Sequence, residues 1–172
     1  LSSMGFQLIL LQFRGCSGTP NRLLRTYHSG HTSDLNHVAE LMKCRFGKLT
    51  AAVGYSLGGN VLLKWLGEND RRALLERAVA ISVPFDLAKS ATRLDQGVSR
   101  IYQKWLIKSL QNKYLLKAEN HKLPCDKNKI HQLNSFWSFD EQLTAPIHGF
   151  SSAADYYRKS SCRSYLHKIS LP

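Results

Sequence analysis

Three short apolar runs lie in the first half of the chain. They cover residues 6–13 (FQLILLQF), 49–55 (LTAAVGY) and 78–83 (AVAISV). Each run is rich in aliphatic residues and lacks strict alternation of polar and apolar positions, which is typical of strands buried on both faces of a parallel sheet. The runs therefore predict three adjacent parallel strands at Phe6–Phe13, Leu49–Tyr55 and Ala78–Val83.

Segments with helical periodicity separate these runs. Residues 31–46 carry an apolar stripe that starts at a capping cluster, Thr32–Asp34, and stops at Gly47. After the second run, Val61, Leu62, Trp65 and Leu66 repeat at the same spacing, and we expect Gly67 to close that helix. The alternation of strands and helices predicts the α/β class, with a parallel sheet and right-handed crossovers.

The strand pattern is lost from Pro84 onward. Residues from about 84 to 146 predict a helical insertion that caps the sheet, and residues 147–172 predict a return to the core through one more helix. The whole chain, 1–172, is then one domain with its core at 1–83 and 147–172. Within the insertion, one helical face is apolar (Ile101, Tyr102, Trp105, Leu106, Leu110) and another is basic (Arg100, Lys104, Lys108). We expect the apolar face, through Ile101, Trp105 and Leu106, to line a pocket.

Half of the formal net charge of +12 lies in residues 100–129 of that insertion. Between Arg100 and Lys129 there are eight basic residues, opposed only by Glu119 and Asp126. One interpretation is a solvated outer face, and the other is a surface for anionic lipid, acyl phosphate or nucleic acid. Few aromatic residues are interleaved with the lysines and no nucleic-acid motif is present, so we expect no nucleic-acid partner.

The cysteines Cys16, Cys44, Cys125 and Cys162 show no C-x-x-C pair and no metal-ligand spacing. This usage predicts reduced thiols, a cytoplasmic location and no bound metal. No apolar run approaches the roughly 20 residues that span a bilayer. The N-terminal residues also lack the pattern of a signal peptide, although the chain begins at Leu1.

The candidate chemistry lies at Gly54-Tyr55-Ser56-Leu57-Gly58, a G-x-S-x-G motif. A predicted strand ends at this motif and a predicted helix begins within it, which is the setting of a nucleophile elbow. Small residues two positions before and after Ser56 leave room for a strained turn. The N–H of Leu57, at the start of the helix, is the expected oxyanion donor. The alternative is a glycine-rich strand–helix turn with an incidental serine.

Five blocks of sequence carry a resemblance to a known family. They are FRGCSGTPNR (13–22), YHSGHTSD (27–34), AAVGYSLGGN (51–60), ISVPFDL (81–87) and TAPIHGFSSAADYYRKSS (144–161). In this order they resemble the YheT-like family of the α/β-hydrolase superfamily, bacterial carboxylesterases that are similar to eukaryotic abhydrolase-domain lipases. The resemblance implies a partial α/β-hydrolase fold with a helical cap insertion, a serine esterase with Ser56 as nucleophile, a small-molecule or lipid ester as substrate, and no cofactor.

The resemblance also implies that parts of the site lie elsewhere. Family members place the catalytic acid and histidine after two further strands, which we expect beyond Pro172, and a second oxyanion donor in a His-Gly loop expected before Leu1. The chain then looks like the middle of a domain, whether as a truncated gene, a pseudogene product or a fragment. Inside the chain, we interpret Asp86 as a helix cap and His148 as a packed or helix-end histidine, and we expect His28 and His31 to cap a helix or stay solvated.

Two functions therefore remain open from the sequence. The first is a serine carboxylesterase, or the incomplete remnant of one, whose activity as this chain alone is expected to be weak. The second is a non-catalytic binding module that uses the basic helical insertion on an anionic membrane or nucleic acid. Peripheral contact with an anionic membrane is a candidate interaction under either function, and the sequence leaves the oligomeric state undetermined.

Overall fold

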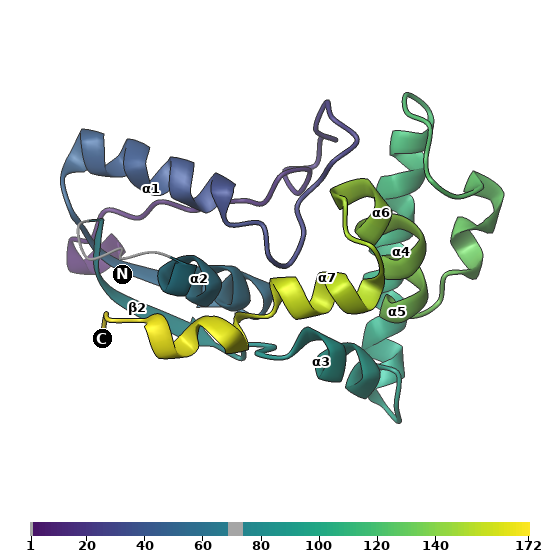
Figure 1. The fold of residues 1–172 in the computed structure, drawn as a ribbon. Coiled ribbons are helices and arrows are strands. Elements are labelled where there is room, and N and C mark those ends of the chain that lie inside the picture. The colour runs from purple at the N-terminus through teal and green to yellow at the C-terminus, as the bar shows by residue number, and fades with distance from the viewer. Residues whose placement is uncertain (1, 69–73) are drawn as a thin grey trace.

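The computed structural model describes residues 2–68 and 74–172 (Figure 1). In chain order the elements are η1 (Ser2–Met4), α1 (Ser33–Phe46), β1 (Leu49–Tyr55), α2 (Leu57–Glu68), β2 (Leu75–Ile81), α3 (Leu87–Leu94), α4 (Ser99–Ala118), η2 (Lys127–Gln132), α5 (Phe136–Phe139), the π-helical turn η3 (Asp140–Thr144), α6 (Ala145–His148), α7 (Ala153–Ser160) and η4 (Cys162–Lys168). The sheet is parallel and helices make up most of the rest, which confirms the predicted α/β class.

The sheet of the described residues consists of β1 and β2, paired in parallel with Val53 opposite Val79 and Tyr55 opposite Ile81. The helix α2 packs against both strands, as its position in the crossover requires. The β1 prediction is confirmed residue for residue. The second strand starts three residues earlier and ends two residues earlier than predicted, because Ser82 adopts a left-handed conformation with φ of 53° that interrupts the extended backbone.

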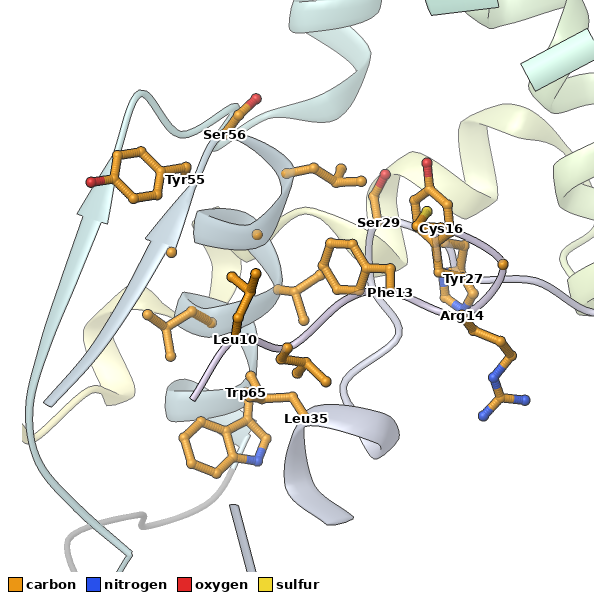
Figure 2. Close-up of a pocket in the computed structure, with 18 of the residues that line it drawn as sticks. Leu10, Phe13, Arg14, Cys16, Tyr27, Ser29, Leu35, Tyr55, Ser56 and Trp65 are labelled. Atoms are coloured by element: carbon orange, nitrogen blue, oxygen red, sulfur yellow. The ribbon is translucent and has the colours of Figure 1, made fainter. Parts of the chain in front are cut away.

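The predicted strand Phe6–Phe13 is wrong. These residues run without strand pairing, and much of their apolar surface is exposed, with Leu10 86% exposed. An apolar composition favours a strand only where a neighbouring strand supplies backbone partners, and β1 pairs with β2 alone in the described sheet. The segment instead passes beside α2, with Leu10 and Phe13 on the side of Trp65 (Figure 2).

The helix α1 begins and ends where expected, although its cap differs from the prediction. Thr32 occupies the N-cap position without a capping bond, and its hydroxyl donates instead to the Glu68 carboxylate at 2.6 Å. Asp34 pairs with Arg14. Gly47 closes the helix with φ of 80°. The first helix turn is therefore fixed by tertiary contacts to α2 and to the N-terminal segment.

The prediction that Gly67 closes α2 is wrong, because the helix continues to Glu68. The physical reason for a glycine here is close packing: a β-carbon on Gly67 would lie 2.7 Å from the Tyr165 β-carbon and nearer still to the Tyr165 carbonyl oxygen. The absence of a side chain lets η4 lie directly against α2.

Residues 84–146 are mostly helical, as predicted, and α3, α4, α5 and α6 gather at the end of the sheet toward which β2 runs (Figure 1). Their core is separate from the one beneath the sheet and centres on Ile107, Tyr114, Ile130, Phe139 and Leu143. The division into a core at 1–83 and 147–172 and a cap stays a prediction.

The helix α4 also buries polar side chains, which its sequence pattern did not indicate. Ile101, Tyr102 and Trp105 are exposed, whereas Gln103 and Lys117 are buried. The buried polar groups are compensated by specific partners: Gln103 donates to Asp95 at 3.0 Å and accepts from the Phe136 N–H at 3.3 Å. These bonds allow Gln103 to be buried on the same side of α4 as Ile107 and Tyr114, because a satisfied buried polar group loses little on leaving water.

The second half of α4 is bound to the loop that precedes α1. The Lys117 ammonium donates to the carbonyl oxygens of Asn21 at 3.0 Å and Leu23 at 2.6 Å, and Lys113 donates to the Cys16 sulfur at 3.2 Å. Desolvation lowers the pKa of Lys117. Together with Gln103, these contacts fix α4 near both of its ends.

Candidate active site

Ser56 occupies the turn between β1 and α2. Its φ of 48° is left-handed, its N–H donates to the Ile81 carbonyl at 2.8 Å, and its carbonyl accepts from the Asn60 N–H at 3.1 Å. The side chain is exposed, and Figure 2 shows the hydroxyl directed beyond the carboxyl end of β1. Left-handed backbone costs a non-glycine residue about 1–3 kcal/mol, so such a residue persists only where its surroundings hold it, as the two backbone bonds do here.

Gly54 is required by the tightness of this turn. A β-carbon at Gly54 would lie 2.7 Å from the Gly58 carbonyl oxygen and 2.8 Å from the α-carbon of Gly59. These are backbone atoms of α2, which cannot give way as a flexible side chain would. The strand can therefore reach the helix this closely only with glycine at position 54.

The expectation that Gly58 must be small for the same reason is wrong. A β-carbon at Gly58 would meet no atom within 4 Å, because this residue faces open space in the cavity described below. The second close approach comes from Gly59, where a β-carbon would lie 2.6 Å from the Val83 side chain. Gly59 lies outside the G-x-S-x-G motif, although it is the residue that packs against Val83, just after β2.

Leu57 is the first residue of α2, so no preceding helical turn supplies a carbonyl acceptor for its N–H. The N-terminal end of a helix carries partial positive charge, which favours an anion beside it. The Leu57 N–H thus follows Ser56 directly in the chain, at the positive end of α2. Its role as the oxyanion donor stays a prediction.

A cavity of about 1880 Å³ extends from the Ser56 turn to the helices of residues 84–146. Trp105 and Leu106 contribute to its lining, as expected. The expectation for Ile101 is wrong, since its side chain is 71% exposed and does not line the cavity. Ligand pockets typically measure about 300–1,000 Å³, so the volume of this hollow exceeds that of an ordinary small-molecule pocket.

Three histidines meet beside the cavity in a cluster that the sequence did not predict. The ring of His28 lies 5.3 Å from that of His31 and 4.7 Å from that of His148, and Tyr156 packs edge-on against it at 5.8 Å. The Nδ1 atom of His28 accepts from the Gly30 N–H at 3.2 Å. Only the fold could reveal this cluster, because His148 is 120 positions from His28 in the printed sequence.

The cluster favours neutral imidazoles. Burial, followed by the neighbouring His148 and His31, lowers the pKa of His28 to about 3. Burial and the nearby His31 lower the pKa of His148 to about 4, and burial also lowers the pKa of His31. The Nε2 atom of His148 is buried and has no hydrogen-bond partner within residues 2–68 and 74–172. His148 ends α6 and is packed, which confirms its interpretation as a packed, helix-end histidine.

Asp86 caps α3, as the sequence suggested. Its carboxylate accepts from the Lys89 N–H at 3.1 Å and lies 3.6 Å from the Arg163 guanidinium. Among residues 2–68 and 74–172, no hydrogen bond joins the Ser56 hydroxyl to a histidine or to a carboxylate such as Asp86. The structure therefore brings no base–acid pair onto Ser56 within the described residues.

A buried carboxylate that the sequence did not single out lies deeper in the same cavity. Asp140 accepts from the Tyr157 hydroxyl at 2.7 Å, and burial raises its pKa to about 6, against the opposing effect of its hydrogen bonds from Thr144 and Tyr157.

Ser82 is a further residue that the sequence analysis did not single out. It shares the left-handed conformation of Ser56 and follows Ile81, the register partner of Tyr55.

All four cysteines are free thiols. Among the described residues, no group of three or more His, Cys, Asp or Glu side chains is arranged to hold a metal ion. Within the same part of the chain, no helix combines the length and apolar character needed to cross a membrane.

Comparisons with known proteins extend over almost the whole chain. The chain is 37% identical over 171 residues to the Escherichia coli protein named "Putative esterase YheT", covering 98% of this chain and 50% of that protein. It is 26% identical over 179 residues to a monoacylglycerol lipase of Saccharomyces cerevisiae, covering 97% and 39% of the two chains. It is 25% identical over 173 residues to the mouse phospholipase ABHD3, covering 98% and 42%.

The chain thus spans half or less of the length of these relatives. No protein-family model matches it. No solved structure matches it significantly.

Proposed function

Since this chain belongs to the YheT-like family of the α/β-hydrolase superfamily, we propose that it carries the nucleophile of a carboxylic ester hydrolase. The single observation that supports the proposal most strongly is the conformation of Ser56. A left-handed, exposed serine between a parallel strand and the first turn of a helix is the arrangement of a nucleophile elbow. The names of the relatives, an esterase and two lipases, support esters as the substrate class.

The chemistry follows from the atoms at this turn. The Ser56 hydroxyl oxygen attacks the ester carbonyl carbon while a base accepts its proton, and the negative charge on the carbonyl oxygen is stabilised by the Leu57 N–H. Collapse of this intermediate breaks the bond to the alkoxy oxygen, which takes the proton and leaves as the alcohol. Water then attacks the acyl-serine in the same way, releasing the carboxylic acid and restoring Ser56. This acyl transfer needs no cofactor.

The histidines of this chain are poor candidates for the base. A general base works best when its pKa lies near the working pH, whereas burial lowers the pKa of His28 to about 3 and that of His148 to about 4. His28 also uses its Nδ1 atom to accept from a backbone N–H. These observations support the expectation that the catalytic histidine and acid lie beyond Pro172, and that residues 1–172 alone hydrolyse esters weakly.

The test measures labelling and turnover separately. Residues 1–172 and a Ser56→Ala variant are treated with a fluorophosphonate probe, and hydrolysis of a p-nitrophenyl ester is measured beside them. We expect slow, Ser56-dependent labelling and turnover several orders of magnitude below that of a full-length relative, because losing one member of a catalytic triad costs about 10⁴–10⁶-fold in rate.

Two outcomes would contradict this proposal. Equal labelling of the parent and of Ser56→Ala would remove Ser56 as the nucleophile. Robust turnover by the parent that His28→Gln or His148→Gln abolishes would show that a base inside the chain completes the site.

A further inference from the structure

The first half of α4 presents an unusual exposed surface. Val98 precedes the helix and is 83% exposed, and within the helix Ile101 is 71% exposed, Tyr102 is 56% exposed and Trp105 is 68% exposed. The spacing of three, four and seven residues places these four side chains along one side of the helix. We call this set the α4 stripe. Tyr102 and Trp105 stack on one another, with ring centroids 6.3 Å apart.

The composition of the α4 stripe matches a lipid interface better than a protein core. Tryptophan and tyrosine favour the boundary between lipid acyl chains and headgroups, where an apolar ring and a polar N–H or O–H are both accommodated. On its opposite side α4 buries residues that include Ile107 and Tyr114, whereas the α4 stripe is exposed among the described residues.

Positive charge borders the α4 stripe. Lys104 and Lys108 are exposed, and helical spacing places both on the side next to Ile101. Neither forms an ion pair with a described carboxylate, so both charges are available to an anionic surface. The net charge of +12 adds a longer-range attraction to any such surface. Apolar side chains flanked by lysines are the pattern of helices that lie in the interface of an anionic bilayer.

The α4 stripe also adjoins the cavity that contains Ser56. Tyr102 and Trp105 line this cavity as well as facing outward, and Leu106 follows them on the inner side. We propose that the α4 stripe with Lys104 and Lys108 is a docking surface for an anionic lipid bilayer, which holds the mouth of the Ser56 cavity against the membrane. A lipid ester leaving the bilayer would meet Tyr102 and Trp105 first.

Sedimentation with lipid vesicles tests this proposal without any turnover. All proteins carry Ser56→Ala, so the result is independent of whether Ser56 is a nucleophile. The vesicles are phosphatidylcholine alone or phosphatidylcholine mixed with phosphatidylglycerol, at low and at high salt. We expect binding to the mixed vesicles that weakens as salt rises, and little binding to phosphatidylcholine alone.

The variants separate the α4 stripe from general charge. Each lysine near an anionic surface strengthens binding about fivefold, so Lys104→Gln with Lys108→Gln should weaken partitioning about 30-fold. Trp105→Gln should weaken it at every salt concentration. The matched control, Arg45→Gln with Lys168→Gln, removes two exposed charges that do not line the cavity and should lose less than the α4 pair. Far-UV circular dichroism checks that each variant is folded.

Three results would overturn the proposal. The first is equal binding by the α4 variant and the control variant. The second is retention of vesicle binding by Trp105→Gln at high and low salt. The third is an absence of vesicle binding together with another occupant of the surface. That occupant would be shown by saturable binding of the parent to single-stranded nucleic acid, or by Trp105-dependent self-association in size-exclusion chromatography.

Discussion

Gly67→Ala is a sharp test of how the end of the chain packs on α2. In an isolated helix this substitution is favourable, because alanine exceeds glycine in helix propensity by about 1 kcal/mol. In the structure Gly67 is buried against η4, and the new methyl group would overlap the backbone of Tyr165, whose carbonyl carbon would lie 2.9 Å away. The two effects therefore have opposite signs.

The steric effect should win. Overpacking typically costs about 1–3 kcal/mol, and the upper part of this range applies where the obstacle is backbone, since α2 and η4 must separate to accommodate the methyl group. After the gain in propensity, a net loss of about 1–2 kcal/mol remains. For a chain of this length that corresponds to a fall in melting temperature of about 2–8 °C.

Thermal and urea unfolding followed by circular dichroism measure this loss. The matched control is Gly58→Ala in the same helix, where a methyl group meets open space and stability should stay equal or rise by up to about 1 kcal/mol. If Gly67→Ala is as stable as Gly58→Ala, the close approach of η4 to α2 is not present in the folded chain and the reasoning fails.

Two further predictions concern buried polar groups. Asn60 is fully buried, and its side chain forms hydrogen bonds with three backbone groups of the segments beside α2. Asn60→Ala should therefore lower the free energy of unfolding in urea by about 3 kcal/mol or more, whereas Asn134→Ala, at an exposed position, should change it little. Equal effects of the two substitutions would refute the role of Asn60. The lowered pKa values of His28 and His148 contribute stability that is present above pH 6.5 and is lost as pH falls toward 4. The raised pKa of Asp140 contributes stability that is present at low pH and is lost as pH rises from 4 through 6. Asp140→Asn should therefore steepen the acid loss between pH 6.5 and 4 in a pH series of urea unfolding, and an unchanged slope would contradict the assignment.

The features that the sequence predicted well are those determined by neighbouring residues. The strand Leu49–Tyr55, the turn at Ser56 and the helix that follows depend on a continuous apolar run, two glycines and a periodic segment. Gly47 as a helix end belongs to the same class. Each of these can be argued from a window of about a dozen residues because the physical causes, strand burial and helix capping, act locally.

The features that it missed depend on partners far along the chain. Gln103 and Lys117 face inward on α4 because Asp95, Phe136 and the carbonyls of the N-terminal loop satisfy them, and no periodicity reports such partners. The histidine cluster likewise exists only once α6 packs beside the segment before α1. Hydrophobic periodicity alone therefore does not identify buried polar side chains such as these.

The anchoring of α4 near both ends has a consequence for the kinetics of docking. A helix held by Gln103 at one end and by Lys113 and Lys117 at the other cannot rotate its exposed side inward without breaking those bonds. Exposure of Trp105 among the described residues is therefore part of the folded structure, and contact of this part of the chain with a surface requires no rotation of α4. Association with a bilayer would proceed at the rate of encounter, set by diffusion and charge, with neither a lag nor a dependence on a rare open state.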